Sequence, residues 1–316
     1  MTVGREADGD CLRKKHNGGL APTFKKAEHT MHIAIIGLGE VGLAYARALH
    51  AAGHALQLCT ARPTPAAKAL ADGCGLPLQT SPGAWLYPCD WILLCVTGSA
   101  ADQVMAQYTP CAAAGTTWCD MTTASPQTKR ASAAMARQHG LHYLDVAIMG
   151  AVALGQHATP LLVAGDGAAV FQAWMQQAGG RVQVIEGGEA GEAVALKILR
   201  STFTKGLEAL SVELLMAAER QGMRDKLYEQ LQDIDDTPLR TFIDMLVRTH
   251  VVHARRRAYE VHEATSEMAN QGISSLVLPG VQQRFEKTMA GLEAHPLDIA
   301  EPTTDDALKW LLQREA

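Results

Sequence analysis

IAIIGLGEVGLAYARALHAAGH, residues 33–54, joins a short apolar run to an amphipathic helix pattern through three closely spaced glycines. The spacing G-x-G-x-x-G between a strand and a helix is typical of a dinucleotide-binding turn. Gly37 permits the tight turn, Gly39 lets the backbone approach a pyrophosphate, and Gly42 permits close packing of helix on strand. The helix N-terminus then directs its N–H groups at the phosphates. The predicted cofactor residues here are Gly37, Leu38, Gly39, Glu40, Val41 and Gly42.

The end of the second apolar run, LQLCTARPT (residues 56–64), bears on the choice between NAD and NADP. Thr60 stands where an acidic residue would bind the ribose 2′-hydroxyl of NAD, and the next acidic residue is Asp72. Arg62 follows two residues later, and its guanidinium suits a 2′-phosphate. A solvated loop arginine is the alternative interpretation. The pattern favours NADP as cofactor, with NAD as the alternative.

Apolar runs and helix-like segments alternate from Met31 onwards. The runs HIAIIG, ALQLC, WILLCV and TTWCD are separated by helical patterns, which predicts βαβ units and a parallel sheet. HYLDVAIMG, TPLLVAGD and RVQVIEG end the strand signals, and nearly everything beyond about residue 189 is helical in pattern. Breaks are expected at GMRD, DDTP, NQGISS, LPG and AHPLD. We predict a flexible N-terminal extension over 1–30, an α/β Rossmann-type parallel sheet domain over 31–190, and an all-α domain over 191–316.

Composition restricts the partners and the compartment. A net charge of -5 argues against nucleic acid and anionic membranes, and no apolar stretch approaches the roughly 20 residues of a membrane span. The seven cysteines form no CxxC pair, and several lie inside apolar runs. No apolar signal core precedes a cleavage site near the N-terminus. We expect a cytoplasmic protein with a small-molecule substrate.

Two further strand ends carry hydroxyl groups. Thr97 and Gly98 follow WILLCV, and Thr123 lies in DMTTASP. Because ligands bind outside the carboxyl ends of parallel strands, we predict that Thr97 and Gly98 approach the nicotinamide ribose. Thr123 is predicted to meet the nicotinamide, the ribose or the substrate. Ser125, directly before Pro126, also fits an ordinary helix N-cap.

The order of these motifs resembles that of the β-hydroxyacid dehydrogenases, which include 3-hydroxyisobutyrate dehydrogenase, 6-phosphogluconate dehydrogenase and the divergent imine reductases. The resemblance covers about residues 31–210 and rests on GLGEVG, LCVTG, DMTTASPQTK, DVAIMGAVALGQHATPLLVAGD and GEAVALKILRS. RSTFTKGLEAL and HARRRAYEVHEATSEM are similar to a bacterial phosphogluconate-dehydrogenase-like branch whose helical domain has no agreed function. The resemblance implies a Rossmann domain, a long interdomain helix and a helical domain that forms a homodimer.

The resemblance gives Lys197 the role of general acid and base, because the family's lysine exchanges a proton with the substrate oxygen beside the nicotinamide. The spacing differs from that of the family, since Gly191 lies six residues before Lys197 and Ser201 replaces an asparagine one turn beyond. Lys197, Ser201 and Lys205 lie on one stripe of a helix. Ser201 is predicted to bind substrate, and Lys205 is the alternative base. A solvated polar face is the simpler interpretation of the same stripe.

The segment from Asp145 to Ala151 departs from the family pattern D-x-P-V-S-G-G. Met149 stands in the position of the serine that binds the substrate carboxylate, and a thioether cannot donate a hydrogen bond. The backbone amides of Gly150 and Ala151 are still predicted to bind substrate. A hydrophobic or differently oriented substrate becomes a better match for the site.

The segment RTHVVHARRRAYEVHE, residues 248–263, concentrates positive charge. On a regular helix, His250, His253, Arg257 and Glu260 share a face, and we predict that His253 and Arg257 attract an anionic substrate in a dimer. A charged surface is the commonest alternative. Two histidines without a third ligand do not predict a metal site.

Together these features predict an NADP-preferring oxidoreductase that interconverts a small, carboxylated 3-hydroxy acid or related alcohol and its carbonyl. An imine reductase is the enzymatic alternative, for which Met149 would line an apolar pocket. A dinucleotide-binding regulator without turnover is the alternative from a different class, because the lysine spacing is altered and the serine is lost.

Overall fold

The structure is a computed structural model that describes residues 30–315. The chain divides into two compact units, one ending at Ala195 and the other comprising Leu196–Ala316. The predicted boundary, after residue 190, falls five residues earlier. The predicted extension lies outside the described residues except for Thr30. The roles assigned to the two domains stay predictions.

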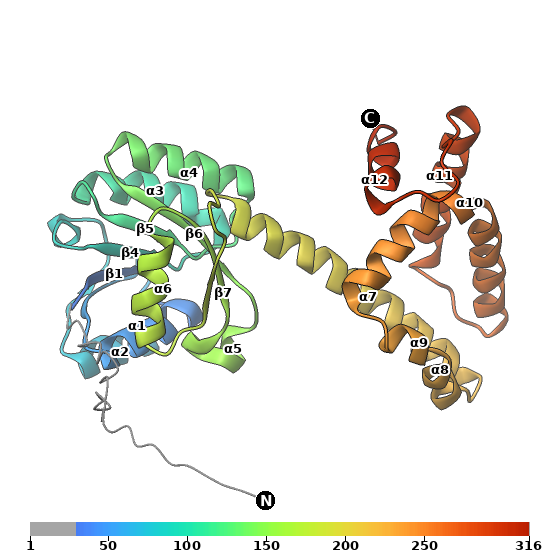
Figure 1. The fold of residues 1–316 in the computed structure, drawn as a ribbon. Helices are drawn as coiled ribbons and strands as arrows, with labels where there is room; N and C mark the ends of the chain where they lie inside the picture. The colour runs from blue at the N-terminus through green and yellow to red at the C-terminus, as the bar shows by residue number, and fades with distance from the viewer. Residues whose placement is uncertain (1–29, 316) are drawn as a thin grey trace, which may run out of the picture. The chain divides into compact units, whose positions relative to one another are not determined.

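One sheet organises the first unit. Within residues 30–315 its strands follow the order β3-β2-β1-β4-β5-β6-β7-β8 (Figure 1). Strands β1 to β6 pair in parallel, and the order of these six is that of a Rossmann sheet. The predicted fold class is therefore confirmed. The strands are β1 (His32–Ile36), β2 (Ala55–Cys59), β3 (Leu78–Gln79), β4 (Trp91–Leu94), β5 (Thr117–Asp120), β6 (His142–Ile148), β7 (Leu161–Gly165) and β8 (Val182–Val184).

The last two strands differ from the predicted all-parallel arrangement. β7 pairs antiparallel with β6, and β8 pairs parallel with β7. The connection between β6 and β7 holds only the short helix α5 (Val152–Gly155) and a 3-10 turn, Gln156–Ala158. A parallel return needs a longer crossover, usually a helix that lies along the sheet. The short connection therefore returns the chain in the opposite direction.

Helices cover both faces of this sheet (Figure 1). The buried cluster on one face joins Ile33 and Ile35 to side chains of α1, α2 and α6. The cluster on the other face joins Ala34 and Ile36 to side chains of α3 and α4. This alternation follows from the two-residue period of a strand that is buried on both sides. The helices are α1 (Glu40–Ala51), α2 (Pro65–Cys74), α3 (Ala101–Tyr108), α4 (Pro126–Gln138) and α6 (Ala168–Gln177).

The second unit is helical, in keeping with the predicted all-α region. Its small buried core joins Val251 of α10 to Ala307 and Trp310 of α12. The predicted break at LPG is instead a helix start, because Pro279 occupies the first turn of α11, where proline is tolerated. The helices are α7 (Glu192–Arg220), which begins in the first unit, α8 (Arg224–Gln230), α9 (Gln232–Asp235), α10 (Leu239–Asn270), α11 (Leu278–Ala294) and α12 (Thr304–Leu312).

Two general properties of the described residues bear on the earlier expectations. No helix within residues 30–315 is long and apolar enough to cross a membrane. The cysteines of this part of the chain are free thiols, and three of them, Cys59, Cys89 and Cys119, are buried. A cytoplasmic location stays a prediction.

Candidate functional site

The carboxyl ends of the parallel strands meet at one edge of the sheet. Ile36 of β1 pairs with Cys59 of β2 and with Leu94 of β4. Leu94 pairs with Asp120 of β5, which pairs in turn with Asp145 of β6. The loops that carry the predicted cofactor residues therefore leave the sheet together, beside the β1–β4 switch point where such sheets bind ligands.

The glycine-rich turn between β1 and α1 depends on two of its glycines for its shape. Gly37 has φ +97°, and a Cβ atom there would lie 2.6 Å from the carbonyl oxygen of Cys95. A Cβ atom at Gly42 would collide with the carbonyl oxygen of Gly37, so this glycine lets α1 close on the turn itself. A Cβ atom at Gly39 would meet nothing within 4 Å. The open space beside Gly39, at the N-terminus of α1, fits an approaching phosphate group.

Thr60 and Arg62 lie just after β2, at the same edge. Thr60 is half-buried, and its N–H donates to the carbonyl oxygen of Gln79 at 3.0 Å. Arg62 is exposed. An exposed guanidinium at this edge is compatible with a 2′-phosphate, and the preference for NADP stays a prediction.

The loops after β4 and β5 touch each other. A Cβ atom at Gly98 would lie 2.9 Å from the carbonyl carbon of Thr123 and 3.1 Å from its Oγ1. Thr97 and Thr123 are exposed, whereas Thr122 is buried. The Thr97 hydroxyl lies 3.2 Å from that of Ser99. The structure thus brings together Gly98 and Thr123, one predicted to bind cofactor and the other cofactor or substrate.

Ser125 is the N-cap of α4. Its hydroxyl oxygen accepts a hydrogen bond from the N–H of Thr128 at 3.1 Å, and Pro126 stands in the first helical turn. This geometry is the capping role that the sequence offered as the alternative to ligand binding.

Met149 is held by apolar packing. It is half-buried, and its N–H donates to the carbonyl oxygen of Pro160 at 2.8 Å. Gly150 and Ala151 are exposed. The Met149 side chain is therefore part of an apolar surface, and it offers no hydrogen-bond donor to a substrate carboxylate. Met149 packs against the buried residues Ala147, Leu162, Ala164 and Ala193.

Helix α7 carries Lys197, Ser201 and Lys205 on one stripe. Lys197 and Ser201 are half-buried, whereas Lys205 is exposed. The apolar residues Leu196 and Leu199 are 46% and 65% exposed. The stripe is therefore not the most solvated face of α7 near Lys197, which argues against the simpler interpretation of a water-facing polar surface.

The predicted positive face of α10 is interrupted. His253 has the non-helical dihedrals φ -113° and ψ 15°, which mark a kink and break the regular spacing on which the shared face depended. Arg257 donates to the Thr249 hydroxyl at 2.9 Å within the same helix. The neighbouring arginines are in exposed ion pairs, Arg255 with Glu293 and Arg256 with Glu260. Within residues 30–315 no group of at least three histidine, cysteine, aspartate or glutamate side chains is placed to hold a metal ion.

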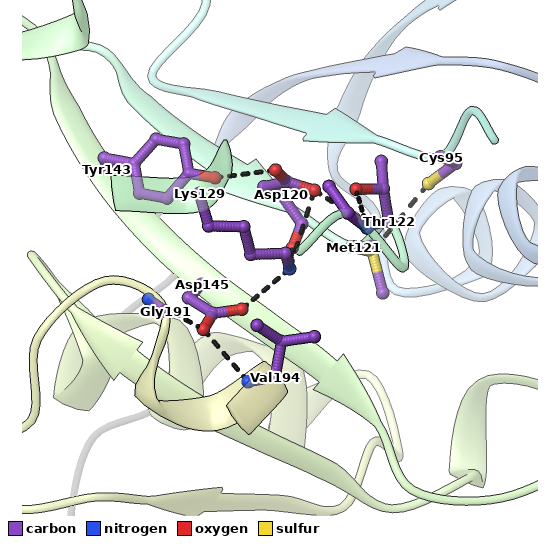
Figure 2. Close-up of polar contacts among 10 residues, drawn as sticks. Cys95, Asp120, Met121, Thr122, Lys129, Tyr143, Asp145, Gly191 and Val194 are labelled. Carbon is purple, nitrogen blue, oxygen red and sulfur yellow. Dashed lines mark hydrogen bonds and ion pairs between the residues drawn. The ribbon is translucent and has the colours of Figure 1, made fainter. Parts of the chain in front are cut away.

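A buried ionic network lies at the same edge of the sheet, and sequence reasoning missed it (Figure 2). Lys129 of α4 has no exposed side-chain surface, and its Nζ donates to Asp145 Oδ1 at 2.7 Å and to the carbonyl oxygen of Asp120 at 2.8 Å. Tyr143 donates to Asp120 Oδ2 at 2.6 Å. Burial, followed by the nearby Asp120, raises the pKa of Tyr143, so it remains a neutral donor. The sequence signal for this network was the presence of aspartates in the apolar runs TTWCD and HYLDVAIMG, because a carboxylate buried in a strand needs a charged or hydrogen-bonding partner.

Comparison with known families identifies the first unit. Residues 32–185 match the NAD-binding domain of 6-phosphogluconate dehydrogenase, and residues 218–288 match a domain of unknown function. The first unit therefore contains an NAD-binding domain like that of 6-phosphogluconate dehydrogenase. This dehydrogenase-type domain contains every predicted cofactor residue, from Gly37 to Gly98.

A curated relative covers only part of the chain. An uncharacterized 28.5 kDa protein from Methanothermus fervidus is 30% identical over 116 residues. The match spans 35% of this chain and 44% of the relative, which is less than half of either protein.

Solved structures share the fold over most of the chain. A conserved protein of unknown function, described as structurally similar to 3-hydroxyacid dehydrogenases, is 26% identical over 82% of this chain and 97% of its own, with a TM-score of 0.59. An imine reductase from Aspergillus terreus, solved with NADPH4 and dibenz[c,e]azepine, is 20% identical over 86% and 97% (TM-score 0.68). A Myxococcus stipitatus imine reductase variant with NAD+ is 18% identical over 90% and 100% (TM-score 0.71). At these identities the two imine reductases show the fold alone.

Proposed function

We propose that the protein is an NADP-preferring oxidoreductase acting on a small 3-hydroxy acid or related alcohol and its carbonyl. The observation that carries this proposal is the sheet edge itself. There the open space beside Gly39 lies at the switch point between β1 and β4. The loop with Gly98, after β4, touches the loop with Thr123, which follows the next strand, β5. A bound nicotinamide cofactor supplies or accepts the hydride. The residues of this chain bind, orient and exchange the proton.

The cofactor-binding roles follow the loops of the dehydrogenase-type domain. The turn from Gly37 to Gly42 and the first N–H groups of α1 hold the pyrophosphate. Thr60 and Arg62 bind the 2′-phosphate, and Thr97 and Gly98 approach the nicotinamide ribose. The related imine reductases were solved with NADPH4 or with NAD+, so direct measurement decides the preference. A lower Kd for NADPH than for NADH, with the difference reduced in Arg62→Ala, supports NADP.

Lys197 is the proposed acid and base. It takes the proton from the substrate hydroxyl when hydride leaves the adjacent carbon, and it returns the proton in the reverse direction. Ser201 and Thr123 orient the substrate, and Lys205 is the alternative base. The backbone amides of Gly150 and Ala151 bind the carboxylate of the substrate.

Met149 is the observation that favours imine reduction as the second candidate. An apolar, half-buried thioether replaces the donor that a carboxylate would need. A neutral or hydrophobic imine needs no such donor, and Lys197 would then give its proton to the imine nitrogen as hydride reaches the carbon.

A homodimer formed through the helical domain completes the proposal. Leu199, Phe203 and Leu207 are 65%, 41% and 51% exposed along α7, more apolar surface than one helix of a stable monomer usually leaves in water. In this dimer His253 and Arg257 would contribute positive charge near an anionic substrate.

A cofactor and substrate panel tests the enzyme proposal. NADPH oxidation is followed with carbonyls and imines, and NADP reduction with hydroxy acids. Lys197→Met is expected to lower kcat by roughly 10²- to 10⁴-fold, the usual contribution of general acid-base catalysis, while the Kd for NADPH stays the same. Lys205→Met tests the alternative base. Lys226→Met, which removes an exposed lysine from α8, is the control and should leave kcat unchanged.

Each outcome separates the candidates. Turnover of hydroxy acids supports the first proposal, and turnover of imines alone supports the second. A loss of kcat in Lys205→Met, without one in Lys197→Met, would transfer the role of base to Lys205. If the protein binds NADPH but turns over no panel member, the non-catalytic regulator replaces both enzyme proposals.

A further inference from the structure

The start of α7 lacks a capping side chain of its own. Gly191, the residue before the helix, has φ +95° and no side chain with which to accept a hydrogen bond. A helix N-cap side chain normally accepts the N–H of the second or third helical residue. Here Asp145 Oδ2 accepts the N–H of Gly191 at 3.0 Å and that of Val194, the third residue of α7, at 3.1 Å. Asp145, from strand β6, therefore caps a helix from a distance in the chain, since Gly191, the residue before that helix, lies 46 residues later.

Lys129 connects this cap to the loop after β5. Its ammonium group donates to Asp145 Oδ1 and to the backbone carbonyl of Asp120 (Figure 2). The Asp120 carboxylate in turn accepts the N–H of Thr122 at 2.8 Å, next to Thr123. One buried cation therefore ties the first turn of α7 to the loop that carries a proposed ligand-binding threonine.

The local packing leaves little room for this arrangement to change. Lys129, Asp120 and Asp145 have no exposed side-chain surface. A Cβ atom at Gly191 would lie 2.8 Å from the carbonyl oxygen of Pro126, so the turn before α7 rests on the start of α4. Buried charges are tolerated only when their partners hold them in good geometry, and loss of one partner leaves the other charge unpaired.

Lys197 lies three residues beyond Val194 on the same helix. Asp145 therefore holds the first turn of the helix that carries Lys197. We propose that Lys129 and Asp145 are positioning residues, which align the start of α7, and with it Lys197, to the Thr122–Thr123 loop. The inference rests on the proposed function, because it assigns the pair to the proton transfer by Lys197.

Three variants and a matched control test the pair in the full chain. Lys129→Met leaves the carboxylates of Asp145 and Asp120 buried without their cation, and Asp145→Asn leaves Lys129 with only the more distant Asp120 carboxylate, 3.6 Å away, as its charged partner. The double variant removes both charges, and the side-chain amide introduced by Asp145→Asn keeps a carbonyl oxygen that can accept an α7 N–H. Thr116→Val is the control: Thr116 is buried at the opposite edge of the sheet, and its hydroxyl donates to the carbonyl oxygen of Cys89 at 2.8 Å.

The first readout is backbone amide hydrogen exchange of the segment 190–198, measured beside Tm. Both single variants should exchange faster in this segment than the wild type, while Thr116→Val should lower Tm without that local change. The second readout is kinetic, with the best substrate of the panel. The single variants should lower kcat by roughly 10- to 100-fold, as expected for a misplaced catalytic group, with KM and the Kd for NADPH within about twofold of wild type. The double variant should recover part of the kcat lost in Lys129→Met, because it no longer buries an unpaired carboxylate at position 145.

The alternative is that the pair contributes only to stability. In that case the single variants behave like Thr116→Val, with a lower Tm but unchanged kcat and unchanged exchange in 190–198, and the proposal fails. If the wild type turns over no substrate, the proposed function fails by itself. The exchange measurement then still decides whether Lys129 and Asp145 align the start of α7.

Discussion

The titratable side chains of this protein differ sharply in how far they are removed from water. Lys129 is fully buried between two carboxylates, whereas Lys197 is half-buried on a helix with exposed apolar neighbours. His250 is also half-buried, but its ring is held by the protein, because its Nε2 lies 2.8 Å from the Thr288 hydroxyl and its ring centroid lies 4.7 Å from that of Phe285. His250 is therefore a packed residue of the helical unit, and it is not part of a substrate-facing charged surface.

His250 makes the stability of the helical unit depend on pH. Burial, followed by the charges of Arg284 and Arg257, lowers the pKa of His250 from 6.5 to about 4. Since the unfolded chain binds the proton more readily, the stability from neutral His250 is present above about pH 6.5 and is lost as pH falls toward about 4. We expect Tm to fall between about pH 7 and about pH 4.5, and to fall less in His250→Gln.

His253→Gln is the matched control for that prediction. His253 is exposed at the kink of the same helix, so its loss should leave the acid-dependent fall in Tm as large as in the wild type. Equal Tm curves for wild type and His250→Gln would show that His250 is not the responsible group.

At the scale of the elements, the turn from β1 to α1 separates structural from ligand-binding glycines. Gly37 and Gly42 are required by close contacts with Cys95 and with each other. Gly39 has φ -82° and open space where a Cβ atom would lie, so the fold itself does not require a glycine there. A ligand that approaches the backbone at Gly39 would require a residue without a side chain at this position.

Alanine at these positions should therefore give opposite results. Gly39→Ala is expected to leave Tm near that of the wild type and to raise the Kd for NADPH by about tenfold or more, because the methyl group occupies the space of the pyrophosphate. Gly42→Ala is expected to lower the free energy of unfolding by about 1–3 kcal/mol through overpacking. Thermal unfolding and fluorescence titration measure the two effects. An unchanged Kd in Gly39→Ala would argue against pyrophosphate binding at this turn.

The whole molecule consists of a well-packed sheet unit and a helical unit with a small core. One series among the exposed apolar residues of α7 follows a spacing of three or four positions, which is the pattern of a helix face that packs against another helix. The series is Leu196, Leu199, Phe203, Leu207, Leu210 and Leu214, whereas the exposed Ile198, Val212 and Met216 lie outside it. In the proposed homodimer this face is buried by the second copy.

Charge placed on that face should prevent the dimer. Phe203→Glu or Leu207→Glu is expected to shift the mass measured by light scattering after size exclusion from two chains to one, because an unpaired carboxylate would be buried in the interface. Val170→Glu is the control, since Val170 is 53% exposed on α6 in the other unit. A wild type that is monomeric at micromolar concentration would contradict the proposal.

Local sequence patterns were sufficient for the elements whose structure depends on nearby residues. The turn from Gly37 to Gly42, the alternating strands and helices, and the cap at Ser125 follow from hydrophobic period and backbone conformation over a few residues. Features that need a second segment were missed. The kink at His253 and the antiparallel return of β7 break patterns that are regular in the sequence.

The amino-acid sequence by itself determined the Rossmann order of elements and the edge at which a dinucleotide would bind, because glycine spacing and apolar periodicity act locally. Only the tertiary structure decided that Lys129 is buried against Asp145, and that Asp145 caps α7. Those contacts join residues 16 and 46 or more positions apart, and they exist because α4, β6 and the start of α7 meet at one edge of the sheet. The charge of a lysine is visible in the sequence, but its partner depends on the fold.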